Sequence, residues 1–257
     1  MTDHQNTGEE TERSYSRMAL LSALVAGLVA MVVILAGPAH GFGLVDHRVA
    51  INALIFGAFA SLAAAVLAAF GLYFARPARG KKGMLVAGGA LGVSLTITIT
   101  LFTMGSNASR VPAIHDITTD IVDPPAFEAV IELRAPGDND PAYAGIDAVG
   151  RYQVDAYPDL QTLYLMEPLA AVFDRAERAA RAMGWKIVAV DRERGRIEAV
   201  ATTFWFGFKD DVVIRVEPAE GGATALDVRS ASRVGVSDLG TNAARIRAFL
   251  EKMTDRV

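Results

Sequence analysis

Three uncharged apolar runs occupy most of the first 105 residues of the chain. They cover residues 18–36, 49–74 and 83–105, and they are 19, 26 and 23 residues long. At about 1.5 Å per residue in a helix, each run is long enough to cross a hydrocarbon core of roughly 30 Å. The pattern predicts three transmembrane helices.

The first run also has some features of a secretory signal peptide, because Gly37, Pro38 and Ala39 after it would suit cleavage at small residues. The apolar core of a signal peptide is shorter, at about 7–15 residues, and two further runs continue the membrane pattern. The sequence therefore favours a first span that is retained.

The pattern changes after residue 105, where polar residues become frequent. Residues 106–126 contain three prolines and no clear period, so they are predicted to form an extended tether. A water-soluble domain is expected over residues 127–257, beginning with a strand at Phe127–Arg134. Apolar residues at helical spacing then predict a helix from Pro168 to Met183, which Gly184 ends.

Apolar and polar residues alternate after Trp185. This alternation predicts four strands, at residues 186–191, 196–206, 211–217 and 223–233. Because short turns join them, the strands are expected to form an antiparallel meander. A last helix is expected at about residues 242–253. The predicted fold class is a membrane α-helical region followed by an α+β domain, in which two helices pack on an antiparallel sheet of four or more strands.

Charged residues indicate which parts of the chain meet lipid and which meet water. Residues 18–105 hold six charged side chains, whereas residues 106–257 hold 42. Basic loops stay in the cytoplasm, and the second connecting loop carries Arg76, Arg79, Lys81 and Lys82. The tail of residues 1–17 is then cytoplasmic, and the α+β domain lies across the membrane. In a bacterium, this describes a multi-pass protein of the inner membrane with a periplasmic domain.

Composition narrows the classes of partner. A formal net charge of -4 gives no basic excess for a nucleic acid, so the lipid bilayer is the expected partner. The three runs contain no Asp, Glu, Lys, Arg or His, which argues against transport by this chain alone. Small residues recur at four-residue spacing, at Gly57, Ser61, Ala65 and Ala69 and again at Gly88 and Gly92. They predict close helix packing, either within this chain or with a membrane-protein partner.

Few residue types that carry metal or nucleophile chemistry occur in the domain. The one histidine after residue 105, His115, stands beside Asp116 in the predicted tether, so no paired histidines are available for a metal, and neither a catalytic residue nor a cofactor is predicted. A structural hydrogen bond is the simpler role for His115. Asp210 and Asp211 form a carboxylate pair near a hairpin, where they either contribute to a ligand site or are solvated.

The densest polar pattern lies in the last predicted strand. Alternation places Asp227, Arg229 and Arg233 on one face of the sheet. Arg215, one strand earlier, is expected to meet Asp227 across the ladder. These side chains either form a charged outer face of the sheet or, with helix N-terminal amides near Gly240, bind a carboxylate or phosphate.

Four aromatic residues cluster near the end of a predicted strand, at Phe204, Trp205, Phe206 and Phe208. They cannot all face one core. Either the strand ends in an exposed aromatic tip, which would suit a membrane surface, or Gly207 forms a bulge that turns more of them inward.

Six strings occur in order between residues 114 and 250, namely IHDITTD, DPPAF, AYPDLQ, RIEAVATT, FGFKDDVVIRV and DVRSASRVGVSDLGTNAARIRAFL. Together they resemble a family of bacterial and plastid proteins known as domain of unknown function fourteen ninety-nine. The resemblance covers Arg110 to about Lys252, and the three-helix N-terminal half is similar to a common membrane-anchored arrangement of that family. It implies no reaction and no ligand.

The sequence thus favours an inner-membrane protein whose periplasmic domain is a binding or assembly module near the membrane surface. One alternative is an enzyme that acts on a periplasmic or lipid-linked anion through Arg229, Arg233, Asp210 and Asp211. A second alternative is an accessory subunit of a membrane complex, joined through the small-residue helix faces.

Overall fold

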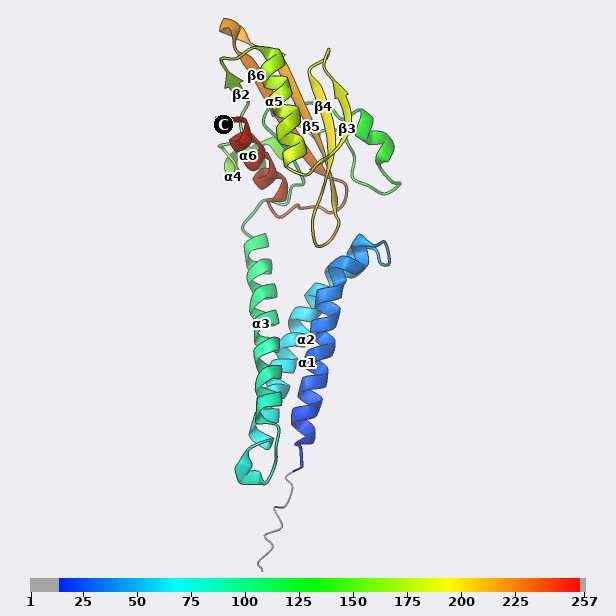
Figure 1. Ribbon diagram of the computed structural model, residues 1–257, viewed down its shortest axis with the longest axis vertical. Coiled ribbons are helices and arrows are strands. Elements are labelled where there is room, and N and C mark those ends of the chain that lie inside the picture. The colour runs from blue at the N-terminus through cyan, green and yellow to red at the C-terminus, as the bar shows by residue number, and fades with distance from the viewer. Residues whose placement is uncertain (1–13, 255–257) are drawn as a thin grey trace, which may run out of the picture. The chain divides into compact units, whose positions relative to one another are not determined.

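The computed structural model describes residues 14–254 and is shown in Figure 1. The chain divides into two compact units, Met1–Ser106 and Asn107–Val257. Most of the predicted cytoplasmic tail, including Arg13, lies outside the described residues. The division between the units falls where the density of charged residues changes along the sequence.

Three helices in the first unit are long and apolar enough to cross a membrane. They are α1 (Arg17–Gly41), α2 (His47–Phe74) and α3 (Met84–Ala108), and a short 3-10 helix, η1 (Pro77–Arg79), lies between the last two. The three predicted membrane helices are confirmed. α1 and α3 continue a few residues beyond their uncharged runs, to Gly41 and Ala108.

Small residues allow these helices to approach closely. A Cβ on Gly57 would lie 2.5 Å from a methyl group of α1, so a larger residue there would push α1 and α2 apart. The Ser61 and Thr98 hydroxyls lie 2.8 Å apart and join α2 to α3 by a hydrogen bond. In contrast, Ala69 and Gly92 are exposed. The predicted small-residue faces are therefore used within the chain only in part.

The segment before α1 pairs with the basic loop between α2 and α3. The Ser16 N–H donates to the Lys82 carbonyl at 2.9 Å, and the Lys82 N–H donates to the Ser14 carbonyl at 3.1 Å. Nearby, the Arg79 guanidinium lies 4.2 Å from the centroid of the Tyr73 ring, which is a cation–π contact. Residues 14–16 and the basic loop therefore lie together at one end of the helices.

The second unit contains a six-stranded sheet in which all pairings are antiparallel. The strands follow the order β1-β6-β5-β4-β3, and β2 also pairs with β6. Their bounds are β1 (Asp116–Thr118), β2 (Leu163–Leu165), β3 (Lys186–Asp191), β4 (Arg196–Thr202), β5 (Lys209–Pro218) and β6 (Thr224–Ser232). The four strands of the predicted meander are confirmed as β3 to β6. β4 ends before residue 206, because the Gly207 N–H donates to the Thr203 carbonyl at 3.0 Å and closes a turn there.

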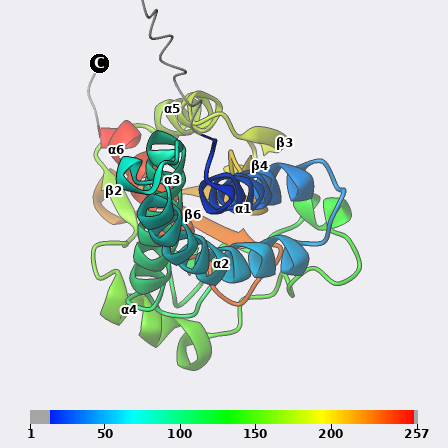
Figure 2. The same cartoon turned by 90° about the horizontal axis from the view of Figure 1, so that it is seen from below.

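Two helices cover one face of this sheet, here called the helix face. α5 (Leu169–Ala182) and α6 (Thr241–Thr254) pack on strand residues such as Ile197, Ile214 and Val228. The Trp185 ring stacks on the Phe249 ring with 5.3 Å between centroids. Both predicted helices are confirmed. Figure 2 shows α5 and α6 on one side of this unit and α4 (Arg151–Ala156) on the other.

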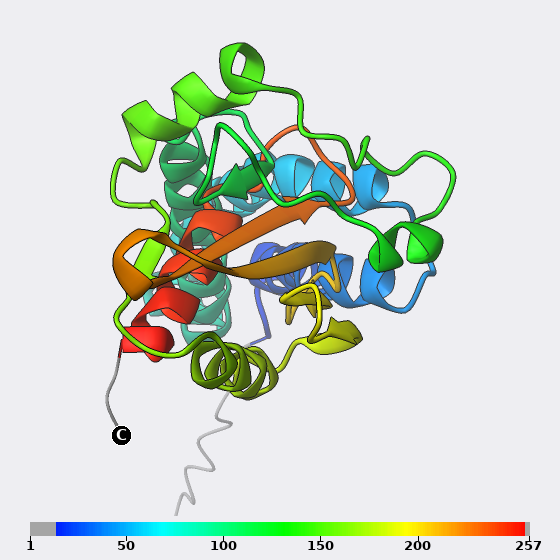
Figure 3. The ribbon, with the colours of Figure 1, turned by 90° about the horizontal axis from the view of Figure 1, so that it is seen from above.

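Residues 119–150, here called the covering segment, lie over the other face of the sheet, shown in green on the side away from α5 in Figure 3. The covering segment contains a 3-10 helix, η2 (Ala129–Leu133), and a π-helix, η3 (Ile146–Gly150). The predicted strand at Phe127–Arg134 is therefore wrong. The buried Glu198 carboxylate accepts backbone N–H bonds from Glu128 and Val130 at 3.0–3.1 Å and winds the chain into a helical turn.

Part of the predicted tether belongs to the sheet. β1 forms within it, and Ile114 and Ile117 are buried in the main core. The Gln153 side chain donates to the Thr118 carbonyl and accepts from the Thr118 N–H, at 2.6 and 3.0 Å, and so takes the place of a neighbouring strand. The tether prediction for residues 106–126 is thus wrong at residues 106–108, which belong to α3, and again beyond residue 115, because a three-residue strand has too little alternation to be recognised.

Candidate functional site

Arg229 lies on the face of the sheet beneath the covering segment, here called the ionic face. Its guanidinium holds the Asp116 carboxylate with two parallel hydrogen bonds of 2.7 and 2.9 Å. It also donates to the Pro125 and Pro141 carbonyls and lies 4.5 Å from the centroid of the Phe127 ring. Only 1% of Arg229 is exposed. The arginine therefore attaches the covering segment to the sheet and is not open to an external anion.

Arg233 is held in the same way by a different carboxylate. Its Nη2 lies 2.6 Å from Asp211 Oδ1, and the Arg134 Nε donates to Asp211 Oδ2 at 2.7 Å. Arg233 also donates to the Leu133 carbonyl at 2.6 Å. Asp211 is completely buried. Two arginines from different segments thus share one buried carboxylate, and charge-assisted bonds of this kind are strong.

Asp210 and Asp211 do not act as a pair, because successive side chains of a strand point to opposite faces. Asp210 lies on the helix face and forms an ion pair with Arg245 of α6. Next to it, the Ser230 hydroxyl donates to the Asn242 Oδ1 at 2.7 Å. The prediction that both carboxylates belong to one site is therefore not supported by their positions.

The backbone amides at the start of α6 are also occupied. Asp238 accepts the Gly240 N–H at 2.9 Å and the Asn242 N–H at 2.7 Å, so it caps the helix. Burial raises the pKa of this carboxyl above its ordinary value. Each part of the predicted anion site, namely the two arginines and the helix amides, is thus bound by a carboxylate of the protein itself.

His115 and Asp116 diverge from each other. The His115 Nδ1 lies 3.4 Å from the Val236 carbonyl, while the neighbouring Asp116 carboxylate binds Arg229. The His115 carbonyl accepts hydrogen bonds from the Ser232 N–H and the Asn242 side chain, both at 2.9 Å. These contacts connect β1 to β6 and α6, which is a structural arrangement.

An open polar hollow of about 610 Å³ lies farther along the ionic face, around Arg215. Arg215 reaches three carboxylates, with its Nη atoms 2.8 Å from Asp123, 3.0 Å from Asp120 and 3.1 Å from Asp227. The predicted cross-strand pair between Arg215 and Asp227 is confirmed. The lining holds five carboxylates and one guanidinium, and it includes the exposed Tyr164. The hollow therefore offers an acidic surface with one aromatic ring.

The aromatic cluster forms the turn between β4 and β5. Phe204 is fully exposed, at 104% of its reference area. The Trp205 and Phe206 rings meet edge to face at 4.9 Å, and the Phe206 and Phe208 rings stack at 4.7 Å. Gly207 has a φ of 67°, which lets the chain turn back at this point. The structure thus has an exposed tip at Phe204, and Gly207 lies in the turn after β4 rather than in a strand bulge that directs the rings into the core.

Sequence reasoning missed three residues that complete these networks, which are Arg134, Glu198 and Arg245. Arg134 lies in an irregular segment, where hydrophobic periodicity gives no information. The arginines of β6 could have served as a signal, because arginines in a strand that is buried on both faces require carboxylates from other segments. The sequence of β6 does not show that both faces are buried, so this signal could not be used.

These features define a class of protein in which three membrane-capable helices precede an antiparallel α+β domain with an ion-paired face. The model of one protein family, described as Protein of unknown function (DUF1499), matches residues 116–253, and this is more than half of the chain. The protein belongs to this family. The match begins at the first residue of β1, in agreement with β1 as the start of the domain. No curated protein matches the chain at a significant level of similarity.

Proposed function

We propose that this protein resides in a bacterial inner membrane and that its α+β domain is a periplasmic module for binding or assembly near the membrane surface. The basic loop between α2 and α3 supports a cytoplasmic position for that loop. The segment before α1 pairs with the same loop through Ser16 and Lys82, which supports placing both on the cytoplasmic side. A chain with three spans then carries its C-terminal domain to the opposite side.

The observation that carries the proposal is the contrast between the buried and the open polar residues of the domain. The covering segment binds the buried Arg229, Arg233 and Asp211 through Arg134 and through backbone carbonyls, so these three side chains are not open to a ligand. The hollow around Arg215 is open, and strands β2, β5 and β6 supply much of its lining, while Arg215 holds Asp120 and Asp123 of the covering segment in place beside them. A preformed polar surface on a rigid sheet suits a binding module.

Fusions after Val257 test the proposed topology. Alkaline phosphatase attached there should be active, because it folds only outside the cytoplasm, while a green fluorescent protein attached there should be dark. Matched fusions in the loop of residues 75–82 should give the opposite pair of results. Bright fluorescence after Val257 would contradict the periplasmic assignment.

Photo-crosslinking in living cells tests the binding role. A photoreactive residue at Tyr164, which lines the hollow, should give one or a few discrete adducts. The same residue at the exposed Arg178 of α5, on the helix side of the domain, serves as a control. Substituting Asp120 and Asp123 by Asn should weaken the Tyr164 adducts. The binding proposal is wrong if Tyr164 gives no adduct, or if both positions give the same adducts.

The two alternatives differ in what the structure offers them. An enzyme that uses Arg229 and Arg233 on an anion would first have to lift the covering segment from the sheet. This would break the buried Arg134–Asp211 ion pair and the hydrogen bonds from the two arginines to backbone carbonyls of the segment. An accessory subunit has exposed small residues available at Ala69 and Gly92. Co-purification in mild detergent should lose a partner after Gly92→Leu if that second role is correct.

A further inference from the structure

The turn between β4 and β5 lies at the same end of the sheet as the start of the domain. Asp116, the first residue of β1, pairs with Ala231, and Ala231 also pairs with Asp211 near the start of β5. The last pair before the turn is Thr202 with Lys209, and it lies two residues along the ladder from the pair of Val200 with Asp211. The chain therefore enters the sheet beside the aromatic turn.

The length of the connection from α3 limits how far this end can be from the membrane. Seven residues, 109–115, separate the last residue of α3 from the first residue of β1. A fully extended chain spans at most about 3.6 Å per residue, so eight steps cover roughly 29 Å. This limit follows from the covalent chain alone. It keeps this end of the sheet within reach of the lipid surface when α3 spans the membrane.

The same end of the sheet exposes large apolar side chains from two separate loops. Phe204 is fully exposed in the β4–β5 turn, and Val236 and Leu239 are 76% and 58% exposed in the loop between β6 and α6. The second loop is fixed at this end, because the Asp238 N–H donates to the Ile114 carbonyl at 3.1 Å. Neither loop is covered by the domain's own core at these positions.

The backbone conformation of Leu239 is also unusual for an exposed apolar residue. Its φ of 55° makes it the one non-glycine residue with positive φ among the described residues. A branched apolar residue in this conformation costs roughly 1 kcal/mol or more compared with glycine. The fold therefore contains an unfavourable backbone whose side chain is left in solvent, and packing within the domain does not account for it.

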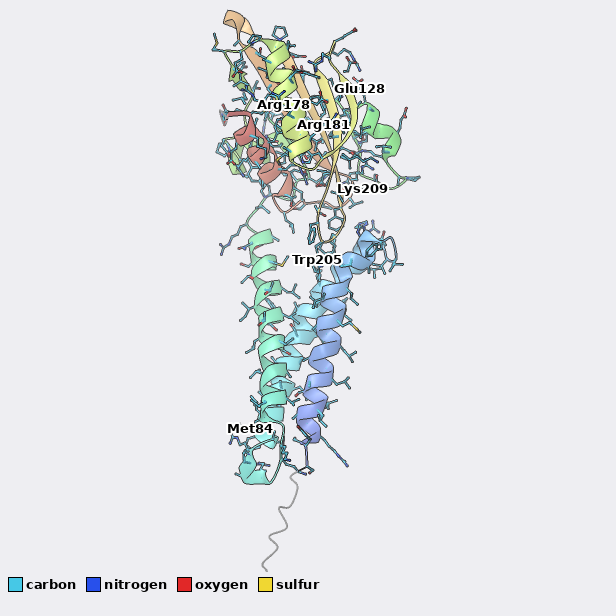
Figure 4. All side chains as sticks on the ribbon, in the orientation of Figure 1. Met84, Glu128, Arg178, Arg181, Trp205 and Lys209 are labelled. Atoms are coloured by element: carbon cyan, nitrogen blue, oxygen red, sulfur yellow. The ribbon has the colours of Figure 1, made fainter. Side chains whose placement is uncertain are left out.

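We propose that the aromatic turn, with Phe204 and Trp205 foremost, inserts into the interfacial layer of the bilayer and docks the domain on lipid. Aromatic rings concentrate in this layer because they combine an apolar body with polarisable or polar edges. Lys209 follows directly and is exposed, so it can reach lipid phosphates. Figure 4 labels Trp205 and Lys209 at this turn. The inference rests on the proposed role near the membrane surface and names the surface as lipid.

Trp205 provides a built-in probe, because the chain has two tryptophans. The other, Trp185, is buried against Phe249. The full-length protein is reconstituted in vesicles of phosphatidylcholine and phosphatidylglycerol, with and without bromine on the acyl chains. Wild type is compared with Trp205→Phe, which retains only Trp185, and the difference between their emissions reports on Trp205 without any change in the core.

Bromine on the acyl chains should remove most of the Trp205 emission and leave the Trp185 emission nearly unchanged. Phe204→Ser should reduce this quenching and increase quenching by aqueous acrylamide. Met166→Ser is the matched control, since Met166 is also exposed, at 79%, but directly follows β2 at the opposite end of the sheet, and it should change neither signal.

Two results would overturn the inference. Trp205 quenched by acrylamide and unaffected by bromine would place the turn in water. Trp205 shielded from both quenchers would place it against protein, either the helices of this chain or a partner. The crosslinking at Tyr164 is a separate measurement at the other end of the sheet. A failure of lipid docking therefore leaves the binding role standing, and a failure of binding leaves lipid docking standing.

Discussion

The two faces of the sheet are both buried, but by different means. The helix face is mostly apolar, and α5 and α6 lie on it with residues such as Phe173, Ile246 and Phe249. The ionic face has a small apolar patch around Val213 and is otherwise joined to the covering segment through Arg229 and other charged residues. Burial of apolar area stabilises the first face, whereas paired charges stabilise the second only when every partner is present.

The difference shows that a strand in which polar and apolar residues alternate does not always have a solvent-exposed face. β6 presents Val228 to the helix face and Arg229 to the ionic face, and both side chains are almost fully buried. An apolar face tolerates gradual change, because each lost methylene removes only its own contribution. A buried ionic face is less tolerant, because the loss of one partner leaves another charge unpaired in a dry environment.

The largest expected effect is at Asp211, which two arginines share. Asp211→Asn should lower the free energy of unfolding by about 3–5 kcal/mol, because Arg134 and Arg233 would remain buried without a counter-charge. The measurement is urea unfolding of the full chain in detergent micelles, followed by tryptophan fluorescence.

Asp159→Asn is the matched control for Asp211→Asn. Asp159 also binds an arginine, Arg247, but this pair is partly exposed, and such pairs contribute about 0.2–1 kcal/mol. A loss of less than about 1 kcal/mol for Asp211→Asn would show that the ionic face is not what holds the covering segment.

Replacing a whole pair should cost less than removing one partner. Asp116→Leu alone leaves Arg229 unpaired and should destabilise the domain by about 3 kcal/mol or more. Combining it with Arg229→Met removes both charges, and the ring of Phe127 can then pack on an apolar side chain. The double variant should recover most of the loss, as measured by the same unfolding experiment. If the double variant is as unstable as Asp116→Leu, the Asp116–Arg229 pair stabilises the face by more than the cancellation of its two buried charges.

The helix face could be predicted from the sequence because its signals are periodic. The helical spacing between Leu169 and Ala182 and the alternation in β3 to β6 each required a buried apolar stripe. The ionic face could not be predicted, because the covering segment has no period and its contacts join residues far apart in the sequence, such as Arg134 with Asp211, which are 77 positions apart. Alternation correctly placed Arg229 and Arg233 on one face but did not show what covers them.

The candidate site was predicted less well than the fold for a related reason. Residue types suggested an anion site, since arginines and helix amides favour anions. The structure supplies Asp116, Asp211 and Asp238 as internal anions for these groups. The Arg215 hollow depends on Asp120 and Asp123, whose approach to β5 follows from the path of an irregular segment.

Glu198 offers an intermediate effect that depends on pH. Burial alone would raise the pKa of this carboxyl, but hydrogen bonds from the Val130 N–H, Arg196 and the Glu128 N–H hold it below the ordinary value of 4.5. The stabilisation is therefore complete above pH 4.5 and is lost as the pH falls toward the folded pKa. Glu198→Gln should cost about 1.5–3 kcal/mol at pH 7, and this cost should shrink in acid. An equal cost at every pH would contradict the ionic role of Glu198.

The smallest expected effect lies outside both faces, on the exposed side of α5. Arg181, which is labelled in Figure 4, binds Glu177 one turn earlier at 2.7 Å, and the Arg181 side chain is 58% exposed. Pairs of this spacing stabilise a helix by about 0.2–0.5 kcal/mol, and salt screens them. Arg181→Gln should therefore change the free energy of unfolding by no more than about 0.5 kcal/mol, and by less in 1 M salt. An effect as large as that of Asp211→Asn would mean that α5 has a partner on its outer side, and the comparison would then have to include a third buried surface.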